Sequence, residues 1–433
     1  MSDSSASSSS SSDFEATEYE SINRAVSQMN AVFSPDAITA CLNVIFEEEE
    51  NERQAASSSS APKVPRRVIY RDHLGAAKLL YEHYFAPNCT YPPDMFRRRF
   101  RMRKEMFLRI VWDIHSFSSV QPLPNHFEFF HKAPTDCAGR PGFNIFQKCT
   151  STIRQLAYSY KADALDEYLQ IAQDTGYQCL DAFCKCVIQL YQHEYLRRPT
   201  EADIRRLTAK HEEVHGFPGM LGSIDCMHWG WRNCLVAWQG QYTRGDKGHP
   251  TIMLPMICGS GMLTLALLDR APKVEFEVNG QRFVKGYYLA DGIYPEWATL
   301  VKSFKCSMEP KSSKFKRYQE AARKDVERAF GVLQGRWQIV EQQARSYSVN
   351  KIKRIMLCCV ILHNMIVEDN GRAITEFEEE LIANTVLPTR TWSERCSTQL
   401  RMYGELRDRR THHELRNALV EHVWNLPKHG RQR

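Results

Sequence analysis

The sequence predicts an α/β domain preceded by an all-α region, and three observations support this fold class. Gly222–Trp229 and Gly286–Gly292 are short apolar runs that each carry one acid, as buried strands with a carboxylate do. Downstream, Ala322–Trp337 places apolar residues three or four positions apart, which is typical of an amphipathic helix. Residues 62–215, in contrast, carry helical patterns over much of their length.

Residues 1–61 are predicted to be a disordered tail. Nine of the first twelve residues are serine, and the tail holds eleven acids against two arginines, a net charge of −9. Such a segment buries too little apolar surface to offset its ordering entropy. Because the whole chain has a net charge of +6, the remainder carries +15. A basic body is compatible with nucleic acid, and equally with many unrelated proteins.

The helical region is predicted over residues 62–215. Pro62–Arg67 is either a basic linker, which we prefer, or a nuclear-localisation patch. Phe96–Lys104 places six cations in nine residues, and these form either a phosphate-contacting face or a solvated helix surface.

Residues 143–195 read as three helices. A short helix over Ala164–Ala172, a turn at Asp174–Gly176 and a helix over Tyr177–Tyr195 have the order of a helix-turn-helix DNA-binding unit. The last helix is expected to expose Gln178, Asp181 and Lys185, a face that is not strongly basic. A plain three-helix bundle is the alternative.

The strands between the two acids are less regular. Thr251–Cys258 is predicted as a second strand and Met262–Leu268 as a third, joined by a Gly-Ser-Gly turn. Lys273–Val278 and Gln281–Val284 flank Asn279-Gly280, which is a strong hairpin signal.

Asp225, Asp291 and Glu327 are the candidate site residues. Glu327 flanks the apolar stripe formed by Ala322, Val326, Phe330, Leu333 and Trp337. Taken singly, a strand-end aspartate is more often a turn residue and a helix glutamate is more often solvated. Together, two strand-borne aspartates and one helix-borne glutamate are hard oxygen ligands for divalent metal. Arg323, one turn before Glu327, could orient it or contact phosphate.

The chain resembles the plant PIF/Harbinger-type transposases and the nuclease-like genes derived from them. The strings that carry the resemblance are GFPGMLGSIDCMHWGW, AWQGQYTRG, GYYLADGIYPEWAT, RKDVERAFGVLQ and CCVILHNMIVED, and it runs from about Phe96 to Asp369. The resemblance implies an RNase H-like domain with a mixed five-stranded sheet. It also implies a DDE triad of Asp225, Asp291 and Glu327 that uses Mg²⁺ or Mn²⁺ on DNA phosphodiesters. Its further implications are DNA and a separate Myb-like DNA-binding protein as partners, and a nuclear location.

One departure from the family pattern concerns the crossover between the two aspartates. Asp225 and Asp291 are 66 residues apart, closer than in the family, and the crossover helix is shortened or missing. We therefore expect a domain over residues 216–370 with an internal deletion, one uncovered sheet face and little or no strand cleavage. The alternatives are a DDE endonuclease and a catalytically impaired copy that binds DNA or chromatin. Residues 371–433 are expected to form a polar helical segment.

Composition limits the other classes of protein. Fourteen cysteines lack Cys-x-x-Cys spacing and no signal peptide is evident, so reduced thiols in the nucleus or cytoplasm are expected. The apolar run Ile252–Leu268 contains Pro255 and two glycines and is short for a span, so no membrane association is predicted. A homo-oligomer is compatible with the sequence.

Overall fold

The computed structural model describes residues 69–427, apart from 132–134, 136–138, 140, 198, 244, 246–247, 260–273, 305–307, 372–400, 402–404 and 406. Several predictions lie outside the described residues: the tail over 1–61, the Pro62–Arg67 segment, the third strand over Met262–Leu268 and the shortened crossover. Within the described part, no helix has the length and apolar character of a membrane span.

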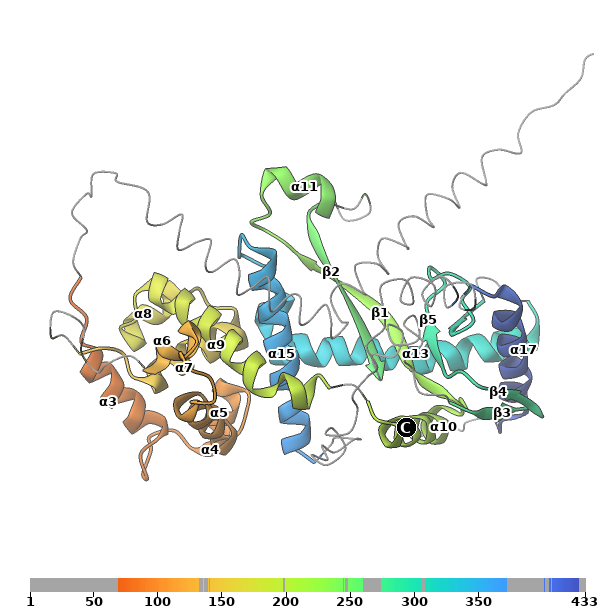
Figure 1. The fold of residues 1–433 in the computed structure, drawn as a ribbon, viewed down its shortest axis with the longest axis horizontal. Coiled ribbons are helices and arrows are strands. Elements are labelled where there is room, and N and C mark those ends of the chain that lie inside the picture. The colour runs from red at the N-terminus through yellow and green to blue at the C-terminus, as the bar shows by residue number, and fades with distance from the viewer. Residues whose placement is uncertain are drawn as a thin grey trace, which may run out of the picture.

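The predicted helical region is present between residues 73 and 195 (Figure 1). Asn144 caps one of its helices, because its side chain accepts from the backbone N–H of Gln147 at 2.8 Å while the Gln147 side chain accepts from that of Asn144 at 3.1 Å. The elements are α3 His73–Tyr84, α4 Pro93–Phe100, α5 Lys104–Ser116, α6 Asn125–His131, α7 Ile145–Tyr158, the 3-10 helix η1 Ala162–Leu165, α8 Asp166–Leu169 and α9 Gln173–Tyr195.

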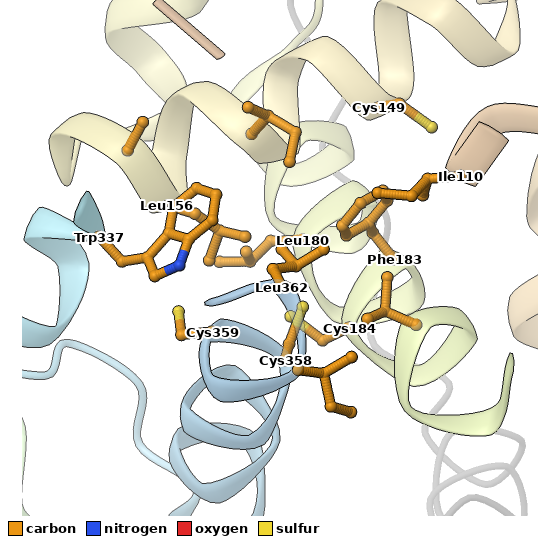
Figure 2. Packing of buried hydrophobic residues seen from close by; sticks show 14 of the residues in the cluster. Ile110, Cys149, Leu156, Leu180, Phe183, Cys184, Trp337, Cys358, Cys359 and Leu362 are labelled. Atoms are coloured by element: carbon orange, nitrogen blue, oxygen red, sulfur yellow. The ribbon is translucent and has the colours of Figure 1, made fainter. Parts of the chain in front are cut away.

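A helix from far down the chain, α15 (Val349–Asp369), packs along α9 and completes the core of this region. Figure 2 shows Leu180 and Cys184 of α9 beside Cys358 and Leu362 of α15, all buried. The same interface holds an ion pair, because a guanidinium nitrogen of Arg354 lies 2.8 Å from Oδ1 of Asp181. The helical region is therefore built from both halves of the sequence.

The predicted helix-turn-helix geometry needs correction. Asp174–Gly176 is not a turn but lies in the first turns of α9, and the connection to α8 comes earlier, at residues 170–172. Gly176 is needed for packing, since a Cβ there would lie 2.7 Å from the Cβ of Ala162. Three residues of α9 were expected to be exposed. Gln178 is exposed, whereas Asp181 and Lys185 are partly buried and form an ion pair beside α15. That face is therefore not free to lie in a DNA groove.

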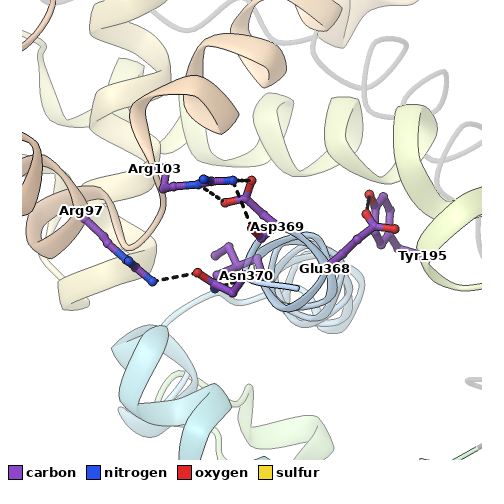
Figure 3. A network of polar contacts seen from close by, with 7 residues as sticks. Arg97, Arg103, Tyr195, Glu368, Asp369 and Asn370 are labelled. Carbon is purple, nitrogen blue, oxygen red and sulfur yellow. Dashed lines mark hydrogen bonds and ion pairs between the residues drawn. The ribbon is translucent and has the colours of Figure 1, made fainter. Parts of the chain in front are cut away.

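Several arginines of the basic segment 96–104 have partners within the protein, although the side chains of Arg97, Arg98 and Arg103 remain exposed, as expected for a solvated helix surface. Arg103 pairs with Asp369 at the end of α15, with Nε 2.6 Å from Oδ2, and Arg97 donates to Oδ1 of Asn370 at 2.8 Å (Figure 3). Arg99 stacks 4.0 Å from the ring centroid of Tyr91. These contacts fasten α4 and α5 to the C-terminal end of α15, so much of this charge has a structural role.

The α/β part contains a four-stranded mixed sheet of order β2-β1-β5-β6. β1 pairs antiparallel with β2 and parallel with β5, and β5 pairs parallel with β6. The predicted second strand is confirmed. The Asn279-Gly280 hairpin is confirmed too, with φ of 50° and 75° at its turn, but it forms a separate two-stranded sheet of β3 and β4. The strands are β1 Met220–Gly230, β2 Thr251–Gly259, β3 Phe276–Val278, β4 Gln281–Phe283, β5 Tyr287–Ala290 and β6 Leu300–Lys302.

Both faces of β5 are buried, so the expectation of an uncovered sheet face is wrong for this strand. Tyr287 and Leu289 join an apolar cluster with α13 and α17, and Tyr288 and Ala290 join a second cluster with α10 and the segment after β5. All four residues are at most 1% exposed. Two of the covering helices come from outside residues 216–370. The helices of this part are α10 Glu201–His215, α11 Val236–Tyr242, α13 Pro310–Arg336, α14 Gln338–Glu341 and α17 Arg409–Asn425.

The long helix α13 connects the two cores (Figure 1). The predicted apolar stripe is confirmed, since each of its five residues is at most 9% exposed. Near one end, Phe315 and Ala322 pack in the cluster under the sheet. Near the other, Leu333 and Trp337 pack in the core of the helical region. The helix that carries Glu327 is thus held at both ends.

Candidate active site

The parallel pairing of β1 and β5 places Asp225 and Asp291 next to each other. Ser223 of β1 is the partner of Leu289 of β5. Each aspartate lies two residues beyond this pair along its own chain, and the charge of Asp291 acts on the carboxyl of Asp225. Asp225 is still within β1, and Asp291 directly follows β5.

Each aspartate also bonds to the backbone beside it. Oδ1 of Asp225 accepts from the N–H of Cys226 at 2.9 Å, and Oδ1 of Asp291 accepts from the N–H of Gly292 at 2.7 Å. These bonds orient the carboxyls and leave their second oxygens for other contacts.

Arg323 links the strand acid to the helix acid. One guanidinium nitrogen lies 3.0 Å from Oε1 of Glu327, and the other lies 3.7 Å from Oδ2 of Asp225. The predicted orienting bond from Arg323 to Glu327 is therefore present. Because Arg323 reaches both acids, Glu327 lies on the side of α13 that faces β1, although its side chain is 46% exposed.

Burial and the neighbouring charged groups shift the pKa of Asp225. Burial raises the pKa of its carboxyl above the ordinary value. The bond from Cys226 and the charge of Arg323 lower the pKa, whereas the charges of Glu327 and Asp291 raise it. The three acids therefore influence one another electrostatically.

Two further residues support the site, and the sequence reasoning missed both. Gln319, fully buried on α13, donates to the carbonyl oxygens of Ala290 at 3.0 Å and Val301 at 3.3 Å. It precedes Arg323 and Glu327 at intervals of four, so all three share one helix face, and it fixes α13 against the residue before Asp291. The spacing of four between Gln319, Arg323 and Glu327 was the feature of the sequence that could have indicated this residue.

Tyr294 is the second supporting residue. Its backbone N–H donates to the carbonyl of Asp291 at 3.2 Å, and its hydroxyl lies 3.0 Å from Sγ of Cys226. Burial, followed by nearby Cys226, raises the pKa of its hydroxyl, so this group stays protonated. Tyr294 thus joins the segments that carry the two aspartates.

The donor set suits Mg²⁺ or Mn²⁺ in kind, because all three candidate ligands are carboxylates and these ions prefer oxygen. Its arrangement differs from that of a metal-bound site. Within the described part of the chain, no three histidine, cysteine or acidic side chains are grouped closely enough to hold an ion. Two of the three acids instead contact a cationic side chain, Arg323.

Comparison with known proteins places these residues in a matched region. A family model described as "Plant transposon protein" matches residues 193–268 and 256–374, which include all three acids. A domain of unknown function matches residues 77–115. Protein Antagonist of Like Heterochromatin Protein 1 of Arabidopsis thaliana is 24% identical over 254 residues, which cover 52% of this chain and 63% of that protein. The chain thus spans less than two thirds of the length of this relative. No solved structure matches the present chain.

Proposed function

We propose that this chain, which is similar to a plant transposon protein family, is related to the PIF/Harbinger-type transposases, and that its α/β part is an RNase H-like domain of the DDE nuclease type. In such a domain the antiparallel strands come first, and the strand with the second acid then pairs in parallel with the first strand. β1, β2 and β5 have this arrangement. We place the domain in residues 216–370, with α10 and α17 from the flanking segments covering it.

The proposed reaction is hydrolysis or transfer of a DNA phosphodiester. Asp225, Asp291 and Glu327 would hold Mg²⁺ or Mn²⁺. The chemistry that such ions supply is activation of the attacking oxygen and stabilisation of the leaving oxygen. Gln319 and Tyr294 would keep the acids in position through their bonds to the backbone beside Asp291. The observation that carries the proposal is that two aspartates follow the paired residues of neighbouring strands, and that Arg323 joins one of them to the helix glutamate.

An uncovered sheet face would indicate an impaired enzyme, but both faces of β5 are buried. The binding-only alternative remains the outcome to exclude by experiment.

We also propose a nuclear, chromatin-associated setting, with DNA and a separate Myb-like DNA-binding protein as partners. The name of the Arabidopsis relative refers to a heterochromatin protein, which supports this setting. The need for a DNA-binding partner is supported by α9, whose candidate reading face packs partly against α15.

The test is nicking of supercoiled plasmid by the full chain with Mn²⁺. We expect nicking that is lost in Asp225→Asn and Asp291→Asn. Glu320→Gln is a matched control, because Glu320 lies on the same helix and its side chain is 45% exposed beside Lys316. It should nick as the unchanged protein does. Absence of nicking by the unchanged protein, or nicking that survives Asp291→Asn, would refute a DDE enzyme and leave the binding-only function.

A further inference from the structure

We infer that Arg323 is the resident counter-cation of the acid site, which a divalent ion has to displace, so that metal binding and DNA binding are coupled through this side chain. The inference rests on the proposed function of the acids. It assigns to Arg323 a regulatory role in addition to its contact with Glu327.

The first step is the position of the guanidinium. Its two terminal nitrogens lie 3.7 Å from an oxygen of Asp225 and 3.0 Å from an oxygen of Glu327. The Arg323 side chain is only 17% exposed, so it lies between these acids rather than in solvent. The positive charge that a metal ion would bring to this place is at present supplied by the protein.

The second step is that the two cations compete. A bound Mg²⁺ needs carboxylate oxygens at 2.0–2.1 Å and tolerates little distortion. An ion on the oxygens that face Arg323 would therefore break the two contacts and repel the guanidinium. The helix face allows this movement, because Glu327 is 46% exposed and can turn with its partner, whereas Asp225 is held by the strand.

The third step concerns the displaced side chain. A guanidinium that leaves two carboxylates needs another anion, and a phosphodiester offers bidentate acceptor geometry. DNA at the site should therefore favour the displaced form and increase metal affinity. By linkage, the metal should increase DNA affinity by the same factor.

The test compares Mn²⁺ affinity, measured by calorimetry at low salt, with and without a short blunt DNA duplex. For the unchanged protein we expect the duplex to tighten Mn²⁺ binding by roughly 5- to 150-fold, the usual range of such coupling. Arg323→Gln should bind Mn²⁺ more tightly without DNA and lose most of the response to the duplex. Lys324→Gln is the matched control, because it removes the same charge from the next, exposed residue. It should behave as the unchanged protein does.

The other outcomes separate this inference from the proposed function. Equal Mn²⁺ affinity of the unchanged protein and Arg323→Gln, abolished in both by Asp291→Asn, would overturn the counter-cation role and leave the metal site intact. A duplex that does not change the affinity of the unchanged protein would overturn the coupling. No Mn²⁺ binding by either form beyond that of Asp291→Asn would refute both proposals. Circular dichroism of each variant shows whether it has folded.

Discussion

The ion pair between Asp181 and Arg354 should be among the most sensitive points of the helical region. The Arg354 side chain is 7% exposed and that of Asp181 is 24% exposed, and Lys185 lies 3.4 Å from the same carboxylate. Asp181→Ala would leave two cations buried without this acid. Removing one partner of a buried pair usually costs about 3–5 kcal/mol, a large part of a typical total stability of roughly 5–15 kcal/mol.

The reverse substitution should be milder. Arg354→Met leaves Asp181 with Lys185 as a partner and replaces the guanidinium by an apolar side chain of similar length. The double variant Asp181→Ala with Arg354→Met should therefore be more stable than Asp181→Ala alone, since an unpaired buried charge has been removed.

The assay is urea unfolding followed by circular dichroism, with all variants measured under the same conditions. Glu201→Ala is the control, because it breaks a pair with Arg205 whose side chains are 73% and 80% exposed. Its effect should stay below about 1 kcal/mol. If Asp181→Ala destabilised the protein no more than Glu201→Ala does, or if the double variant were the less stable one, the account of α9 and α15 would be wrong.

Three further predictions concern α17, acid stability and DNA. Leu419→Ala, at a fully buried position on α17, should cost roughly 2–5 kcal/mol in thermal or urea unfolding, whereas Val332→Ala, at a position 51% exposed, should have little effect. Burial, together with His215 for one and Arg336 for the other, lowers the pKa of His211 and His363 to about 4. Because the folded protein holds both rings neutral, they contribute stability above pH 6.5, and this contribution is lost as the pH falls towards 4. Replacing both histidines by Gln should therefore flatten the decrease in melting temperature between pH 6.5 and 5. The isolated chain should bind DNA weakly and with a steep salt dependence in gel-shift titrations, and tight sequence-specific binding at physiological salt would contradict this.

The parts of the fold that depend on local pattern could be predicted from the sequence. The α13 stripe follows from apolar residues at helical spacing, and the β3–β4 hairpin follows from Asn279-Gly280, whose positive φ values suit that turn. The motifs around Asp225 and Asp291 likewise marked two strands that prove to be neighbours.

What could not be predicted depends on contacts between distant residues. Gly176 looked like a turn residue because its close approach to Ala162 is visible only in three dimensions. The arginines of segment 96–104 looked like free charge because their partners, such as Asp369, lie far away in the sequence. Gln319 could not be identified from the sequence, because the carbonyls that it contacts lie on β5 and β6.

The packing of α15 on α9 has a consequence for synthesis on the ribosome. Asp181 and Arg354 are 173 residues apart, which corresponds to roughly 10–35 s of elongation at about 5–20 residues per second. During that interval the apolar side of α9 has no α15 to cover it, so the N-terminal helices cannot complete their core as they emerge. We expect ribosome-bound chains stalled before α15 to be cleaved by protease within residues 70–195 and to recruit chaperones. Chains stalled well beyond residue 369 should be protected in the same segment.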